Sequence, residues 1–181
     1  MKLDRNAFSE VFMIPLSSAI SVGLTWSKVS HQNYQLKLND EVVGTLHRPS
    51  LWSSSFLAET QSGRWTFRRA GWLGAGAQIL DSGSQQEVAT FKSSWSGTGT
   101  LTFAGGQTFH VVCKGLWHPV WSVIAANGET LLRLHTREKE VEVSAQSDVA
   151  DSRVSLLLMF TWYRVLQAEE DAAAAAIAAA S

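Results

Sequence analysis

The chain has 181 residues, of which 45% are hydrophobic, so it is long and apolar enough for one domain with a sizeable core. Its 15 basic and 16 acidic residues nearly cancel, which argues against the bulk attraction to nucleic acid that basic proteins show. Cys113 is the only cysteine, so an internal disulfide and a thiolate metal cage are excluded, and a reducing, cytoplasmic location is expected.

The first segment, residues 1–25, is expected to form an N-terminal arm or a first strand. Val11–Ile20 (VFMIPLSSAI) follows Lys2 and Arg5 and has some character of a secretory signal core. However, Pro15 interrupts the apolar run, acidic residues dilute the basic region, and no small-x-small cleavage site follows. An arm or strand is therefore preferred to a cleaved signal.

From Tyr34 to about Val143, strand-like runs alternate with turn signals. In each run, apolar residues take every second position, which is the period of a strand with one buried face. The runs are Tyr34–Leu38, Val42–Leu46, Trp65–Phe67, Leu101–Phe103, Phe109–Cys113, Trp121–Val123 and Val141–Val143. The turn signals are Asn39-Asp40, Ser62-Gly63, Ser82-Gly83, Gly105-Gly106 and Asn127-Gly128. Short strands at this spacing predict an antiparallel sandwich or barrel.

Val154–Leu166 (VSLLLMFTWYRVL) is predicted to be a helix that is apolar on nearly all sides. Apart from Ser155, the polar residues in and beside it fall within one narrow arc of the helical wheel, which Leu157 and Phe160 interrupt: Arg153, Thr161, Arg164 and Gln167. Such a helix must be enclosed, yet it is too short for a bilayer, which needs roughly 17–25 apolar residues. A sandwich fills its own core, whereas a closed barrel of many strands leaves a lumen. The predicted fold is therefore mainly β, a closed antiparallel β-barrel enclosing a hydrophobic C-terminal α-helix.

The barrel domain is expected to span residues 26–167, with its central helix at about 151–167. Arg164 would be costly at mid-depth, so we expect it near a barrel mouth, where its guanidinium reaches water or a carboxylate. Residues 168–181 (AEEDAAAAAIAAAS) favour helix but offer almost nothing to bury. They are predicted to form a fraying helical extension or a disordered end.

The order of these segments resembles that of a known superfamily. The matching runs are DEVVGTL (40–46), SGRWTFRR (62–69), EVATFK (87–92), GTLTFAGGQTF (99–109), NGETLLRL (127–134) and the WY (162–163) of the last helix. This series resembles the tubby C-terminal-like superfamily, which includes tubby, the plant LURP-one-related proteins and the phospholipid scramblases. The resemblance covers roughly Trp26 to Leu166 and is one of pattern and element order, not of an invariant motif.

The resemblance implies a closed antiparallel barrel around a hydrophobic C-terminal helix, and a role in binding membrane surfaces or partner proteins. Tubby domains bind phosphoinositide head groups through basic side chains on the barrel exterior, but no tubby motif is present onto which those ligands can be carried. Scramblases carry an acidic calcium-binding segment. Because this chain lacks a D-x-[DN]-x-[DN]-G loop, calcium binding is not supported.

The basic group Arg64, Arg68 and Arg69 is the candidate site for an anionic partner. Arg64 and Arg68 project from one strand face, opposite Trp65 and Phe67. Lys92 and Arg48 join them if their strands lie close together. The alternative is a solvated strand face that discourages edge aggregation.

No metal, cofactor or catalytic site is predicted. His110 and Cys113 are three residues apart on one strand and so face opposite ways, and His118 lies in a turn. Cys113 is in phase with apolar neighbours and is expected to be a small buried hydrophobe. The sequence contains no G-x-S-x-G elbow, no P-loop and no dinucleotide fingerprint after a strand. Glu169 and Glu170 are tail carboxylates with no visible pocket around them.

The tryptophans divide into two groups. Trp65, Trp121 and Trp162 are in phase with core positions, so packing is their expected role. A second group lies in or beside turns rich in serine and glycine: Trp52, Trp72, Trp95 and Trp117. Exposed loop tryptophans prefer membrane interfaces, although loop aromatics also fold back onto barrel ends.

The sequence thus favours a non-enzymatic binding domain, cytoplasmic or peripheral to a membrane, whose partner is an anionic phospholipid, a membrane surface or a protein, and not nucleic acid. The first alternative is a lipocalin-like carrier of a small apolar ligand. Against it, Gly63-Arg64-Trp65 imitates the lipocalin G-x-W only mid-chain, and a lipocalin helix is amphipathic and packs outside its barrel. The second alternative is an enzyme of unknown chemistry, which requires a pocket lined by convergent polar groups.

Overall fold

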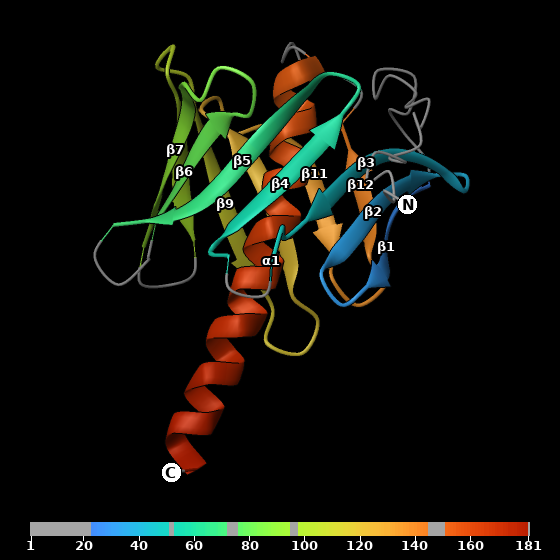
Figure 1. Ribbon diagram of the computed structural model, residues 1–181, viewed down its shortest axis with the longest axis vertical. Helices are drawn as coiled ribbons and strands as arrows, with labels where there is room; N and C mark the ends of the chain where they lie inside the picture. Colours follow the sequence, from blue (N-terminus) through green and yellow to red (C-terminus); the bar gives the residue numbers. More distant parts are fainter. Residues whose placement is uncertain (1–22, 51–52, 72–75, 95–97, 145–150, 181) are drawn as a thin grey trace, which may run out of the picture.

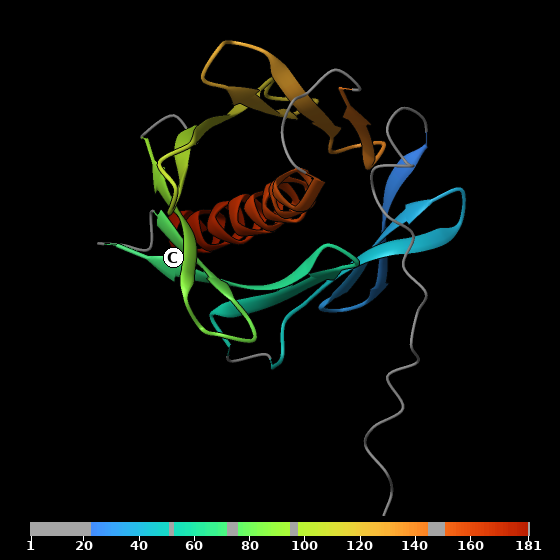
Figure 2. The same cartoon turned by 90° about the horizontal axis from the view of Figure 1, so that it is seen from above.

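The computed structural model describes residues 23–50, 53–71, 76–94, 98–144 and 151–180. Within them, twelve strands form one closed antiparallel barrel, and a long helix runs through it (Figures 1 and 2). The strands are β1 (Leu24–Ser30), β2 (Asn33–Leu38), β3 (Glu41–His47), β4 (Ser55–Thr60), β5 (Gly63–Ala70), β6 (Gly76–Asp81), β7 (Glu87–Ser93), β8 (Gly99–Phe103), β9 (Thr108–Lys114), β10 (Val120–Ala125), β11 (Thr130–His135) and β12 (Glu140–Val143), and the helix is α1 (Asp151–Ala180). The predicted fold class is confirmed.

Each strand pairs with its neighbours in sequence, and β12 closes the barrel against β1. The closing seam is short. Its register joins Leu24 to Val141 and Thr25 to Glu140, and the Trp26 amide adds a 2.8 Å hydrogen bond to the carbonyl of Lys139. By contrast, every residue of β10 from Val120 to Ala125 pairs with β9.

The predicted alternation places apolar side chains in the lumen because neighbouring residues of a strand point to opposite faces. On β5, Trp65 and Phe67 are buried and Arg64 and Arg68 are exposed. The tight turns also follow the predicted chemistry. Asn39 and Asp40 adopt positive φ angles of 48° and 73°, the conformation that a two-residue hairpin turn demands.

The helix occupies the lumen, as predicted (Figure 2). Its residues from Val154 to Gln167 are buried on every side, which explains why the apolar positions show no single face. Phe160 packs against Phe67 and Phe91, with ring centroids 5.7 and 5.2 Å apart. On β3, a Cβ atom at Gly44 would lie 3.0 Å from the sulfur of Met159, so glycine allows the helix to approach this strand closely.

Arg164 departs from its expected surroundings. Its side chain is in the core and only 7% exposed, and among the described residues no ion pair joins it to a carboxylate. Its Nη1 donates a 2.5 Å hydrogen bond to Oε1 of Gln167, and its guanidinium lies 4.8 Å from the centroid of the Phe91 ring. The cation is therefore accommodated by a neighbouring amide on the same helix and by an aromatic face.

The helix does not stop at the barrel. It continues without a break to Ala180, so residues 169–180 form an exposed helical extension (Figure 1). No helix in the described ranges combines the length and apolar character needed to cross a bilayer. Of the predicted N-terminal arm or first strand, residues 1–25, the structure describes only the end, where Leu24 and Thr25 begin β1. The possible signal core, Val11–Ile20, lies outside the described residues.

Candidate functional site

The end of the barrel from which α1 projects is called the exit end below. It carries an ion-pair cluster and exposed hydrophobic side chains. The turns and connections at this end join β1 to β2, β3 to β4, and so on to β11 and β12 (Figure 1). The described part of the chain exposes these large hydrophobic side chains: Val29, Leu116, Trp117 and Ile177. All of them belong to the exit end or to the projecting part of α1.

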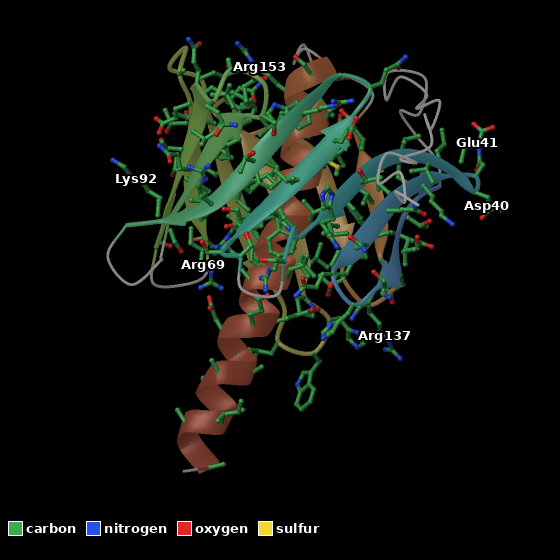
Figure 3. All side chains as sticks on the ribbon, in the orientation of Figure 1. Asp40, Glu41, Arg69, Lys92, Arg137 and Arg153 are labelled. Atoms are coloured by element: carbon green, nitrogen blue, oxygen red, sulfur yellow. The ribbon has the colours of Figure 1, made fainter. Side chains whose placement is uncertain are left out.

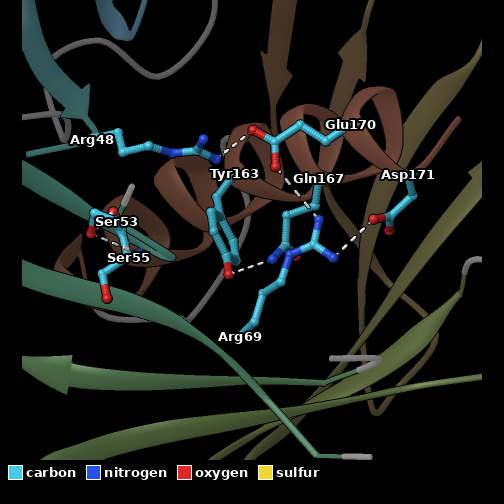
Figure 4. Close-up of polar contacts among 8 residues, drawn as sticks. All are labelled: Arg48, Ser53, Ser55, Arg69, Tyr163, Gln167, Glu170 and Asp171. Carbon is cyan, nitrogen blue, oxygen red and sulfur yellow. Dashed lines mark hydrogen bonds and ion pairs between the residues drawn. The ribbon is translucent and has the colours of Figure 1, made fainter. Parts of the chain in front are cut away.

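An ion-pair cluster holds α1 where it leaves the barrel (Figure 4). Arg48 pairs with Glu170, and Arg69 contacts Glu170 at 3.6 Å and Asp171 at 2.8 Å. The Arg48 guanidinium also lies 4.5 Å from the centroid of the Phe56 ring. Both arginines sit near strand ends on inward-facing positions, which is why they meet the helix. The cluster pairs both arginines with acidic residues of α1, Glu170 and Asp171.

A chain of buried hydrogen bonds lies one turn deeper. The amide nitrogen of Gln167 donates to the hydroxyl oxygen of Tyr163 at 2.5 Å, and the Gln167 oxygen accepts from Arg164 at 2.5 Å. Burial raises the pKa of the Tyr163 hydroxyl well above its ordinary value of 10. This chain gives hydrogen-bond partners to the Gln167 amide, the Tyr163 hydroxyl oxygen and Arg164 Nη1, whereas the buried Arg164 Nε has none.

The five basic residues predicted to bind an anion do not form one surface. Arg48 and Arg69 belong to the exit cluster, where carboxylates of α1 engage them. Arg64 pairs with Glu59 at 2.7 Å on the outer wall. Arg68, on the same wall, reaches Gln85 at 3.5 Å, and Lys92 lies on β7, two strands away (Figure 3). The alternation that places Arg68 outside necessarily turns Arg69 inward.

Leu116 and Trp117 are the most exposed large hydrophobic residues described, at 96% and 90%. They form the tip of the connection between β9 and β10. Gly115 starts this tip with a φ of +90°, and a Cβ atom there would lie 2.7 Å from the carbonyl oxygen of His118. Thr136 anchors the connection, donating from its amide at 3.3 Å and its hydroxyl at 2.9 Å to the Pro119 carbonyl. The apolar tip is therefore held outward by a fixed backbone.

Basic residues lie in the same connection as this tip and in the turn that approaches it. They come from the β9–β10 connection and the neighbouring β11–β12 turn: Lys114, His118, Arg137 and Lys139, with Glu138 in the same turn. Arg137 and His118 approach each other at 3.5 Å, which joins the two connections (Figure 3 shows Arg137 at this end). Leu116, Trp117 and these four basic residues are called the exit rim below. The sequence indicated Trp117 as a loop tryptophan, but it gave no sign that two connections distant in sequence combine.

A pocket of about 270 Å³ opens beside the helix at the same end. Its lining includes Lys28, His31, Tyr34, Arg48, Phe56 and Glu169. Burial, followed by the charges of Glu169 and Glu170, raises the pKa of the Tyr34 hydroxyl. From the sequence, Glu169 was expected to be a tail carboxylate without a pocket. Tyr34, Arg48 and Phe56, which line the pocket with it, lie more than a hundred residues away along the chain and approach it only on the folded barrel.

The residues weighed for metal binding and catalysis are dispersed. His110 is exposed and lies 3.3 Å from the hydroxyl of Thr100, whereas Cys113 is half-buried. Burial raises the pKa of the Cys113 thiol, which keeps it protonated and weakens it as a nucleophile. Within the described ranges, no group of three or more metal-ligating side chains comes together.

The tryptophans predicted to pack do so. Trp65 and Trp121 are buried in the wall, and Trp162 stacks on Trp26 with ring centroids 5.1 Å apart. Of the predicted loop tryptophans, Trp52, Trp72 and Trp95 lie outside the described residues. Only Trp117 of that group can be placed, and it is exposed.

Comparison with known proteins does not extend these observations. No protein-family model, no curated protein and no solved structure matches the chain. The resemblance to the tubby C-terminal-like superfamily therefore stays a prediction from the sequence. The barrel with its enclosed helix agrees with the fold that the resemblance implied, but a shared architecture does not establish a family or a function.

Proposed function

We propose that this protein is a non-enzymatic binding domain that attaches to anionic membrane surfaces with its exit end toward the lipid. The observation that carries the proposal is the exit rim, where Leu116 and Trp117 stand almost fully exposed on a fixed turn. Placing such side chains in water is unfavourable, and tryptophan favours the interface between lipid and water.

The surrounding charges support an anionic surface. Lys114, Arg137 and Lys139 would each contribute roughly 1 kcal/mol near such a membrane, in a manner sensitive to salt. The acidic residues of α1 at this end oppose binding less than their number suggests, because Arg48 and Arg69 pair with Glu170 and Asp171. Attachment by a few such contacts would be weak and reversible.

The carrier alternative has less support. A lipocalin-like carrier needs an empty lumen, and here Leu157, Phe160 and Tyr163 fill it without exposure to solvent. An apolar ligand would have to displace the helix itself. The described cavities instead lie at the surface, and the one beside the helix has charged walls.

The test is co-sedimentation of the intact chain with vesicles of phosphatidylcholine alone or mixed with phosphatidylglycerol. We expect binding only to the mixed vesicles. A Leu116→Ser, Trp117→Ser double variant is expected to bind at least about tenfold more weakly, since each buried apolar side chain contributes about 1.5–3 kcal/mol.

The matched control is Arg68→Glu, which changes the outer wall and leaves the exit rim intact. Unchanged binding by this control supports the proposal. Binding that is lost in Arg68→Glu but kept in the double variant moves the site to the outer wall and overturns it. No binding of the intact chain to either vesicle also overturns it, in favour of a protein partner.

A further inference from the structure

The pocket beside α1 has walls of opposite charge. One wall comes from β1 and the turn after it, and carries Lys28 and His31. The other comes from the helix and carries Glu169 and Glu170. Tyr34 and Phe56 contribute aromatic surface. The pocket therefore brings cation, anion and ring faces together in about 270 Å³.

The charges of the two walls do not all neutralise one another. Arg48 pairs with Glu170, but within the described part of the chain neither an ion pair nor a hydrogen bond joins Lys28 to Glu169. The Lys28 ammonium instead lies 6.0 Å from the centroid of the Tyr34 ring. A basic group, an acidic group and an aromatic side chain thus line the same cavity.

This arrangement selects the charge of a ligand. A simple anion would be attracted by Lys28 but repelled by the carboxylates. A simple cation would be attracted by the carboxylates but repelled by Lys28. A small molecule with both charges can satisfy both walls. Its anionic group would bind Lys28 and His31, and its ammonium would bind Glu169 and rest on the faces of Tyr34 or Phe56.

We propose that this pocket binds a phosphate and an ammonium group joined by a short linker, the chemistry of phosphoethanolamine and of amine-bearing phospholipid head groups. Phosphate suits the basic wall because its several oxygens can accept from Lys28 and His31 together. The pocket volume admits a head group but not acyl chains. The lipid form of this ligand rests on the proposed membrane attachment, whereas the soluble form does not.

The first experiment uses isothermal titration calorimetry to measure the binding of O-phosphoethanolamine, inorganic phosphate and ethanolamine to the intact chain. Phosphoethanolamine is expected to bind at least about tenfold more tightly than either single-charge compound, since each half adds a charge-assisted contact. Equal binding of inorganic phosphate overturns the proposal, and so does the absence of binding by phosphoethanolamine.

Two pocket variants and two controls locate the site. Glu169→Gln and Lys28→Gln are each expected to weaken phosphoethanolamine binding about tenfold. Both residues are exposed, so thermal melting should confirm intact folding. Glu41→Gln and Lys92→Gln make the same charge changes elsewhere on the barrel and should leave binding unchanged (Figure 3). Equal losses in pocket variants and controls would mean a general charge effect and overturn the site.

Vesicles separate this proposal from the proposed function. Phosphatidylserine and phosphatidylglycerol carry the same net charge, but only phosphatidylserine has an ammonium. Stronger binding to phosphatidylserine vesicles that Glu169→Gln abolishes supports a lipid ligand. Equal binding to both, still dependent on Trp117, keeps the membrane function and overturns the lipid form. Tight phosphoethanolamine binding without vesicle binding overturns the membrane function and leaves a soluble ligand in the pocket.

Discussion

The helix α1 consists of two halves with opposite relations to the rest of the protein. From Val154 to Gln167 its side chains are buried in the lumen, and from Glu169 onward they are exposed. The backbone conformation is the same throughout. The first half depends on the barrel to cover its apolar surface, whereas the alanine-rich second half is helical through local propensity. A single regular element can thus be tertiary core at one end and a free-standing extension at the other.

The largest expected difference between the halves is in packing. Phe160→Ala removes a ring that contacts Phe67, Phe91 and Tyr163, and should lower the free energy of unfolding by about 3–5 kcal/mol. Ile177→Ala, in the projecting half, should change it by less than about 0.5 kcal/mol. Urea denaturation followed by circular dichroism measures both. Similar losses in the two variants would contradict the distinction.

A smaller effect concerns the buried hydrogen bonds. Tyr163→Phe leaves the Gln167 amide without its acceptor and should cost about 1–3 kcal/mol at neutral pH. Because the folded pKa of Tyr163 is raised, its contribution is fully present below pH 10, its ordinary value, and is lost as pH rises further. Stability of the natural chain should therefore fall above pH 10. The variant should show a shallower fall in the same denaturation series, and identical slopes would contradict the argument.

The smallest effect is expected at the boundary between the halves. Arg69→Met removes the ion pairs to Glu170 and Asp171 but keeps most of the side-chain volume. Because the pairs are partly exposed, the loss should be under about 1 kcal/mol and should shrink in high salt. Thermal melting at two salt concentrations checks this, with Arg64→Met on the outer wall as the control. A loss that is insensitive to salt would assign Arg69 a packing role instead.

The sequence was sufficient for the architecture because strands leave a periodic signal and an all-round apolar helix leaves a compositional one. Alternation in Trp65–Phe67 and the Asn39-Asp40 turn are local properties, and the need to enclose Val154–Leu166 follows from its composition. The surroundings of Arg164 were harder to predict from the free-energy cost of burying a charge. Its guanidinium is stabilised by a hydrogen bond to Gln167 and by the face of the Phe91 ring, and neither contact is visible in the sequence.

The candidate site was less predictable because it is made of contacts between distant segments. Arg68 and Arg69 are adjacent in sequence but point to opposite sides of the wall, so one basic cluster became two environments. Glu169 acquires a pocket only when β1 and β2 close around the helix. Trp117 was visible as a loop tryptophan, yet its basic neighbours Arg137 and Lys139 come from another hairpin.

The short seam between β1 and β12 has a consequence for how the chain assembles. The central helix follows all twelve strands in the chain, so it can enter the lumen only after the residues of the whole wall have been made. The seam between β1 and β12 pairs only Leu24 with Val141 and Thr25 with Glu140, with one further hydrogen bond, so it contributes little stability by itself. The other neighbouring strands are consecutive in the chain and can pair as hairpins. We therefore expect β1 to pair with β12 late in folding, in the same cooperative step in which α1 packs into the lumen.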